Sequence, residues 1–171
     1  MRNIRQDFYQ KYKQDLKFAD FFIKYFFDIG FRVVVIYRIQ SFCYDSKFKF
    51  LRLISYLLKN KNNIKYGVEI GINAKIGPGF VVRHIGGIVI GDKVRIGENF
   101  TIYQHVTIGQ NHGKYPKLLN NIIIYPHSKI IGNILITNDV IVGMNSFIRC
   151  NIDKSGIYYG NNFHKKGTKH E

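Results

Sequence analysis

Histidine is the residue type in this chain best suited to chemistry near neutral pH, because an imidazole can take a proton from a hydroxyl group as that group attacks an electrophile. Four histidines lie close together in the sequence: His84, His105, His112 and His127. His84 and His112 occupy the two places where an otherwise regular pattern is interrupted. A metal site built from these histidines is the alternative. However, counted in the six-residue repeats described below, their spacing does not place three of them on the same rung, that is, at the same level of the stack of repeats.

The interrupted pattern is a repeat of six residues. Its aliphatic anchors are Ile64, Ile70, Ile76, Val82, Ile90, Ile96, Ile102, Ile108, Leu118, Ile124, Ile130, Ile136, Val142 and Ile148. Neither the helical period of about 3.6 residues nor the two-residue period of a strand produces this spacing. A solenoid does, because each coil buries its anchors against the next. Three hexapeptides close a triangular coil, so the sequence predicts a mainly β protein, a parallel β-helix of about five coils.

Glycine follows several anchors, at Gly71, Gly77, Gly91, Gly97, Gly109 and Gly143. We expect these glycines to relieve crowded turns that need a positive φ.

The repeat slips at two points. Val82 and Ile90 are eight residues apart, and Ile108 and Leu118 are ten apart, so two and four residues are inserted. A perfect solenoid has no cavity, and a site is therefore expected where the period departs from six. Because both insertions carry a histidine, the sequence predicts a site there, with His84 as candidate general base.

The first 63 residues have a helical pattern instead. Phe8, Tyr12, Leu16, Phe22 and Phe26 recur at roughly helical intervals, which predicts a helix that ends at Gly30, with further helices over 33–44 and 47–59. The aromatic face of these helices has two interpretations. It packs against a neighbouring element, or it rests on an anionic membrane surface.

Composition narrows the possible partners. The net charge is +15, and residues 1–66 hold 14 Lys and Arg against 5 Asp and Glu. No basic cluster matches a nucleic-acid-binding module, so we expect no nucleic acid partner. No segment resembles a signal peptide or a membrane span, and the two separate cysteines fit a reducing compartment. A cytoplasmic location, or one at the inner face of the cytoplasmic membrane, is expected.

From about Ile64 to Lys166 the chain resembles the left-handed β-helix of hexapeptide-repeat acyltransferases, and its motifs are similar to those of serine acetyltransferases. Segment 67–70 resembles that family's Gly-Val-Asp-Ile, and segment 83–91 resembles its Asp-His-Ala-Thr-Gly-Ile-Val-Val-Gly. Segments 103–109, 115–118, 130–134 and 142–147 resemble further family motifs. The resemblance implies an acetyl-CoA-dependent O-acetyltransferase. On that match His84 is the base and Glu69, fifteen residues earlier, is its orienting partner.

The departures from the family concern the acceptor. The resemblance implies substrate-binding roles for Arg83, His105, Lys114 and Tyr115. Arg83 replaces an Asp that helps hold the amino acid, and Lys114 and Tyr115 replace an Arg and a His. The remaining features resemble polysaccharide O-acetyltransferases, so a sugar hydroxyl of a bacterial capsule or lipopolysaccharide is the predicted acceptor. Arg83 and Lys114 would suit an acidic sugar or a sugar phosphate. Two alternatives stay open: a serine O-acetyltransferase, and a non-catalytic or metal-binding β-helix.

The resemblance also implies where acetyl-CoA binds, how the subunits assemble and how the chain divides into domains. The pantetheine arm of acetyl-CoA is expected near Gly109, Pro126, Gly143 and Met144, with Lys165 and Lys166 toward the nucleotide. No resident metal is expected. A homotrimer with active sites between subunits is implied. The predicted parts are a helical region over 1–63, the β-helix over 64–153 and a C-terminal tail over 154–171.

Overall fold

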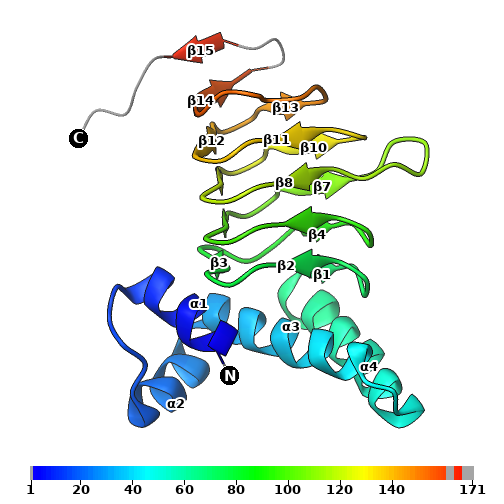
Figure 1. Cartoon of the computed structure of the whole chain (residues 1–171). Coiled ribbons are helices and arrows are strands. Elements are labelled where there is room, and N and C mark those ends of the chain that lie inside the picture. The colour runs from blue at the N-terminus through cyan, green and yellow to red at the C-terminus, as the bar shows by residue number, and fades with distance from the viewer. Residues whose placement is uncertain (1, 161–163, 167–171) are drawn as a thin grey trace.

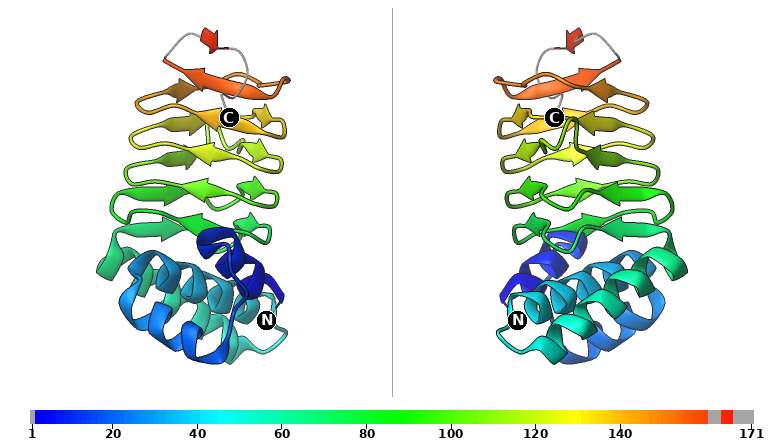
Figure 2. Two further views of the ribbon diagram at one scale, coloured as in Figure 1. Left: turned by 90° about the vertical axis from the view of Figure 1, so that its left-hand side faces the viewer. Right: turned by 90° about the vertical axis from the view of Figure 1, so that its right-hand side faces the viewer.

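The computed structural model describes residues 2–160 and 164–166, and it consists of a group of helices beneath a stack of short strands (Figure 1). The helices are α1 (Arg2–Tyr12), α2 (Phe18–Phe27), α3 (Ile29–Asp45) and α4 (Lys49–Tyr66). Two views from opposite sides, each turned by 90° from Figure 1, show the stack as a regular prism with the helices at one end (Figure 2). None of the described helices is both long enough and apolar enough to cross a membrane.

The strands form three parallel sheets, each of which takes one strand from successive coils. Sheet A contains β1 (Val68–Ile70), β4 (Ile88–Ile90), β7 (Thr107–Gly109), β10 (Lys129–Ile131) and β13 (Phe147–Ile148). Sheet B contains β2 (Lys75–Ile76), β5 (Arg95–Ile96), β8 (Lys117–Leu118) and β11 (Leu135–Ile136). Sheet C contains β3 (Val81–Val82), β6 (Thr101–Ile102), β9 (Ile123–Ile124), β12 (Val140–Val142) and β14 (Gly156–Tyr159), followed by antiparallel β15 (His164–Lys166). The predicted β-helix of about five coils is confirmed.

The hexapeptide anchors form the core of the prism. In sheet A the register aligns Ile70 with Ile90, Ile90 with Ile108 and Ile108 with Ile130. The anchors from Ile70 to Ile148 are buried, most of them completely. Burial of a large aliphatic side chain stabilises a fold by about 1.5–3 kcal/mol, so the repeat in the sequence is the main stabilising feature of the stack.

Ile64 is the one anchor that the sequence assigned wrongly. Its side chain is 85% exposed and lies on α4, which continues to Tyr66. Gly67 then ends the helix in the left-handed conformation, with φ of 61°. Glycine adopts this conformation without steric cost, and β1 begins at the next residue. The first coil therefore starts after this cap and not at Ile64.

The glycines that follow the anchors serve close packing, which differs from our expectation. None of Gly71, Gly77, Gly91 or Gly97 has a positive φ, whereas a Cβ on any of them would come closer than 3.0 Å to an atom of the coil above. The left-handed turns fall instead on the third residue after an anchor, at Asn99, His105, Asn121, His127, Asp139 and Asn145. Asn, Asp and His tolerate this conformation better than most residues.

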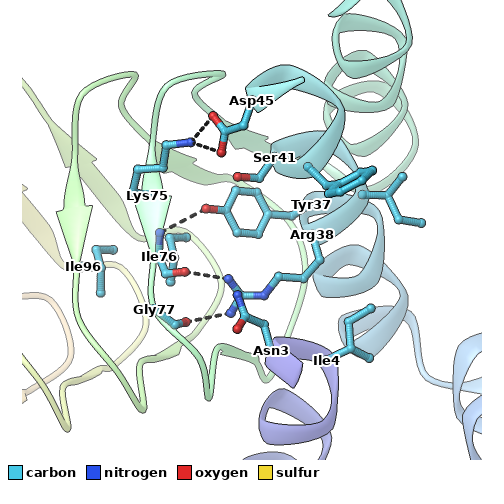
Figure 3. Close-up of a pocket in the computed structure, with 12 residues that line it drawn as sticks. Asn3, Ile4, Tyr37, Arg38, Ser41, Asp45, Lys75, Ile76, Gly77 and Ile96 are labelled. Carbon is cyan, nitrogen blue, oxygen red and sulfur yellow. Dashed lines mark hydrogen bonds and ion pairs between the residues drawn. The ribbon is translucent and has the colours of Figure 1, made fainter. Parts of the chain in front are cut away.

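The helices dock onto the first coil through a buried ion pair. The guanidinium of Arg38 donates to both carboxylate oxygens of Asp7 at 2.8 Å and to the carbonyl oxygens of Ile76 and Gly77. Asp7 also accepts from the backbone N–H of Phe80 at 2.8 Å. Figure 3 shows Arg38 beside Tyr37, whose hydroxyl accepts a hydrogen bond from the Ile76 N–H. Helices α1 and α3 thus satisfy groups that the lowest coil would otherwise leave unpaired.

The predicted end of the first helix at Gly30 is wrong. The helical pattern divides into α1 and α2, and α2 ends at Phe27. The side chain of the next residue, Asp28, caps α3 by accepting from the Phe31 N–H. Gly30 lies in the first turn of α3. A Cβ there would clash with the carbonyl oxygen of Val82 and with Lys11 Nζ, so glycine allows α3 to approach β3 closely.

A Gly71→Ala variant is expected to be less stable by about 1–3 kcal/mol, because the added methyl group overlaps the backbone of Asp92 and overpacking of a rigid core costs this much. Thermal unfolding followed by circular dichroism measures the effect. Gly109→Ala is the matched control, since its Cβ would meet only side-chain carbons, Cδ1 of Ile131 at 3.3 Å and Cγ2 of Thr107 at 3.8 Å. Equal melting temperatures for the two variants would contradict the close-packing role.

Candidate active site

His84 lies in the turn between β3 and β4, where the chain passes from sheet C to sheet A. We call this corner of the prism the C–A edge. The side chain of His84 is exposed, and its ring centroid lies 5.8 Å from that of Tyr103 on the turn above. Tyr103 in turn stacks on Tyr125 at 5.0 Å. The inserted turn therefore presents the imidazole at the foot of a column of aromatic rings that follows the edge.

A second column on the same edge contains two of the other histidines. His105 and His127 stack with ring centroids 4.7 Å apart and an angle of 17° between the ring planes. Both adopt the left-handed conformation, with φ of 57° and 63°. A Cβ on Gly87 would overlap the His105 ring, so a glycine in the inserted turn allows His105 to lie directly over it. The structure thus brings His105 and Arg83 to the same edge as His84.

A cavity of about 490 Å³ adjoins His84 on the side of the helices. It is lined by Ile23, Lys24, Phe27, Asp28, Ile29, Gly30, Arg83, His84 and Ile85. The junction of α2 and α3 therefore forms one wall and the inserted turn forms the other. The sequence pattern did not predict this wall. The signals that could have indicated it are Asp28, a helix-capping residue, and Gly30 beside it.

Asp28, which lines this cavity, accepts hydrogen bonds from several groups. Its carboxylate accepts hydrogen bonds from Lys11 Nζ and from the Tyr12 hydroxyl, both at 2.6 Å. Burial raises the pKa of Asp28, but these two hydrogen bonds, the one from the Phe31 N–H and the charge of Lys11 together hold the pKa below its ordinary value. Burial lowers the pKa of Lys11, and the nearby charges of Arg83 and Lys24 lower it further. The cluster thus contains more positive than negative charge.

Glu69 lies on β1 of sheet A, in register with Val89 of β4. Its carboxylate is half-exposed, with Lys59 Nζ 3.7 Å from Oε1. Among the described residues Glu69 forms no hydrogen bond or ion pair with His84. The role of Glu69 as orienting partner therefore stays a prediction.

Lys114 and Tyr115 lie on a different corner, where the chain passes from sheet A to sheet B, which we call the A–B edge. They belong to the longer insertion, a loop that projects between β7 and β8 (Figure 1) and is closed by a bridge between Asn111 and Lys114. The Tyr115 ring packs over Gly91, whose Cβ would lie 2.9 Å from it. Within one chain the two insertions are therefore not brought together, and His112 stays on the A–B edge with the loop.

The predicted donor-binding residues also divide between edges. Pro126, Gly143 and Met144 lie on the C–A edge in the turns above His84, whereas Gly109 lies at the A–B edge. Met144 is 65% exposed. Lys165 and Lys166 pair through their backbones with β14, but their side chains lie outside the described residues. Across residues 2–160 and 164–166 no group of three or more His, Cys, Asp or Glu side chains could hold a metal ion.

Comparison with models of known protein families gives no match. The serine acetyltransferase of Synechococcus elongatus is 33% identical over 123 residues, which cover 70% of this chain and 49% of the relative. That of Staphylococcus epidermidis is 44% identical over 86 residues, which cover 48% and 40%. The chain thus spans about half the length of the curated relatives it matches. The predicted similarity to serine acetyltransferases is confirmed, whereas a closer relation to polysaccharide O-acetyltransferases finds no support in these relatives.

Solved structures share the whole architecture. A serine acetyltransferase from Brucella abortus in complex with coenzyme A superposes with a TM-score of 0.84 at 21% identity, covering 99% of this chain and 68% of that chain. Another serine acetyltransferase in complex with CoA superposes with a TM-score of 0.71 at 28% identity, covering 80% and 57%. The likeness confirms the left-handed β-helix fold with its N-terminal helices.

An Asp28→Asn variant is expected to lose about 1–3 kcal/mol of stability at neutral pH, because it removes the negative charge that accepts two part-buried hydrogen bonds, from Lys11 and Tyr12. Since folding lowers the pKa of Asp28, its contribution is present above the ordinary value of 3.8 and is lost as the pH falls through the folded-state pKa. The difference in melting temperature between wild type and variant should therefore shrink below about pH 4.

Asp45→Asn is the matched control for this measurement, because the Asp45–Lys75 ion pair lies at 2.6 Å with both side chains 40% or more exposed. An exposed pair contributes about 0–1 kcal/mol. If the two variants lose equal stability, or if the Asp28 difference persists at low pH, the charged hydrogen bonds of Asp28 do not stabilise the fold as predicted.

Proposed function

We propose that this protein is an acetyl-CoA-dependent O-acetyltransferase with His84 as its general base. The observation that carries the proposal is the exposed imidazole in the inserted turn, next to a cavity on an edge of the β-helix. The similarity to serine acetyltransferases, and to solved examples in complex with CoA, supports acetyl-CoA as the donor.

The reaction needs one proton to move twice. His84 accepts the proton of an acceptor hydroxyl as the oxygen attacks the thioester carbonyl carbon. The C–S bond then breaks, the new C–O ester remains, and the imidazolium returns the proton to the departing CoA thiolate. A carboxylate on the other ring nitrogen would orient the imidazole and stabilise its charged form. We assign this part to Glu69, which would have to exchange Lys59 for the imidazole.

We further propose a homotrimer in which each active site lies between two subunits. The position of the insertions supports this assembly, because the C–A edge carries His84 and Arg83 while the A–B edge carries Lys114 and Tyr115. A neighbouring copy that sets its A–B edge against the C–A edge would unite the two halves. The pantetheine arm would then follow the C–A edge past Pro126, Gly143 and Met144. Pro126 has no N–H to donate, so neighbouring residues would supply the backbone donors, with Lys165 and Lys166 toward the nucleotide.

Two acceptors are candidates for the hydroxyl. Free serine is supported by the relatives, which are serine acetyltransferases. A sugar hydroxyl, as in bacterial surface polysaccharides, is supported only by this chain's own residues, above all by Arg83, which lines the cavity.

A His84→Asn variant is expected to turn over about 10²–10⁴-fold more slowly than wild type, since this is the usual contribution of a general base. Glu69→Gln should have a smaller effect. The measurement is release of CoA thiol from acetyl-CoA, with L-serine and with a panel of bacterial polysaccharides as acceptors. An unchanged melting temperature controls for folding. If no acceptor gives CoA release that depends on His84, the proposed activity is wrong.

Peripheral membrane contact through the helices is the remaining part of the proposal. Helix α2 has no buried residue. Its exposed apolar side chains that do not line the cavity beside His84 are Phe18, Phe22 and Phe26. Lys17 precedes them, and residues 1–66 hold nine more Lys and Arg than Asp and Glu. Apolar rings beside lysines match the interface of an anionic bilayer.

Replacing both Phe18 and Phe26 by Ser should therefore weaken binding to phosphatidylglycerol vesicles at least about tenfold, because each buried ring is worth about 1.5–3 kcal/mol. Co-sedimentation measures the binding, and phosphatidylcholine vesicles show its dependence on charge. Leu135→Ser, at an exposed apolar residue on β11, is the control. Equal vesicle binding by both variants would contradict the membrane role of α2.

A further inference from the structure

We infer that the cavity beside His84 binds an acceptor of net negative charge, one that carries a carboxylate or phosphate group near the reacting hydroxyl. The inference rests on the proposed function and names the substrate class of the same site. It depends on the charges that face the cavity from each of its walls, and on which of those charges are already paired.

Among the described residues, Asp28 is the only acidic group that lines the cavity, and it already accepts three hydrogen bonds. Asp28 accepts from Lys11 and Tyr12 at 2.6 Å and from the backbone N–H of Phe31 at 2.9 Å. Lys11 Nζ also donates a hydrogen bond to the carbonyl oxygen of Val82 at 3.1 Å. Asp28 and Lys11 therefore neutralise each other, and Asp28 has little capacity left for a positively charged ligand.

Two further cations line the same cavity, and neither forms an ion pair with an acidic side chain of the described residues. Arg83 is exposed in the inserted turn, and its side chain makes no hydrogen bond or ion pair with any described residue. Lys24 reaches in from α2, with its Nζ 4.9 Å from the centre of the Tyr12 ring. Both charges are close enough to Lys11 to disfavour its protonated form, so the three cations form one cluster with a single carboxylate.

Such a cluster selects its ligand by charge. A bound anion reduces the repulsion among neighbouring positive charges. An Arg side chain can bind a carboxylate or phosphate through two parallel hydrogen bonds. A zwitterion such as serine would place its ammonium group among these cations, and no free carboxylate lines the cavity in the described part of the chain to receive it. The positive field therefore favours an anionic hydroxyl compound over free serine.

The remaining walls fit the body of such a ligand. Ile23, Phe27, Ile29 and Ile85 contribute apolar surface to the cavity, against which the carbon face of a sugar ring can pack. The volume of about 490 Å³ lies within the range of about 300–1,000 Å³ typical of small-molecule sites. It exceeds what a three-carbon amino acid needs.

Binding of three probes by the full chain tests the inference: glucose 6-phosphate, glucuronate and glucose, each titrated by isothermal calorimetry. The phosphate or the carboxylate probe should bind at least about tenfold more tightly than glucose, as expected for charge-assisted bonds. Preference for one of the two anions identifies the group that the site takes. Arg83→Glu and Lys24→Glu should each remove the preference, whereas Lys49→Glu, an equal charge change at the exposed start of α4, should retain it.

Glucose binding as tightly as both anions, no binding of any probe, or an unchanged preference in the Arg83 and Lys24 variants would overturn the inference. These outcomes leave the proposed function intact, because that function is tested by CoA release that depends on His84. Conversely, anion binding without any such release would retain an anion site and reject the acetyl transfer. In an active enzyme, Arg83→Glu should raise the KM of an anionic acceptor without raising that of acetyl-CoA, which separates acceptor binding from binding of the CoA phosphates.

Discussion

The ion pair between Arg38 and Asp7 joins the two halves of the molecule. Both side chains are almost completely buried, at 8% and 0% exposure, and together they satisfy the carbonyl oxygens of Ile76 and Gly77 and the N–H of Phe80. Removing one partner of a buried pair typically costs about 3–5 kcal/mol, because the other charge is left uncompensated. The first coil has no coil beneath it, so the helices take the place of one. The orientation of α2 and α3, and with it the wall of the His84 cavity, depends on this joint.

The candidate site lies on the edges of the prism because the inward side chains and the backbone groups of the strands are already used to hold the coils together. Inward residues fill the core, and coil-to-coil hydrogen bonds use the backbone of every strand. At the corner between sheets B and C, side chains of successive turns form a ladder of hydrogen bonds that stabilises the stack. Asn99 donates to Asn121 at 2.9 Å, and Asn121 donates to Asp139 at 3.0 Å. At the C–A edge the equivalent positions hold His105 and His127, which stack and extend no such ladder. The same turn geometry thus supports structure at one corner and exposed imidazoles at another.

How much could be read from the sequence differs between the coils and the helices. The period of six predicted the coils, their number and the burial of every anchor except Ile64. The interruptions of that period located His84 and Tyr115, because a solenoid tolerates extra residues only at its turns. The role of the glycines that follow the anchors was predicted wrongly. The sequence shows that glycine is needed there, but not whether the reason is a positive φ or a close packing contact. The break between α2 and α3 was misplaced at Gly30 for the same reason: only the approach of Val82 explains that glycine.

The sequence by itself determined the β-helix, the exposed histidine on one of its edges and the excess of positive charge, because each of these follows from local spacing or from counting. The tertiary structure alone decided what surrounds that histidine. Lys11, Lys24, Asp28 and Arg83 are spread over more than seventy residues, and no local pattern relates them. The docking of α1, α2 and α3 on the first coil brings Lys24, Asp28 and Arg83 to one cavity, with Lys11 bound to Asp28. That docking also places Lys59, rather than His84, beside Glu69. Contacts between residues distant in the chain are set by packing, which a periodic pattern does not encode.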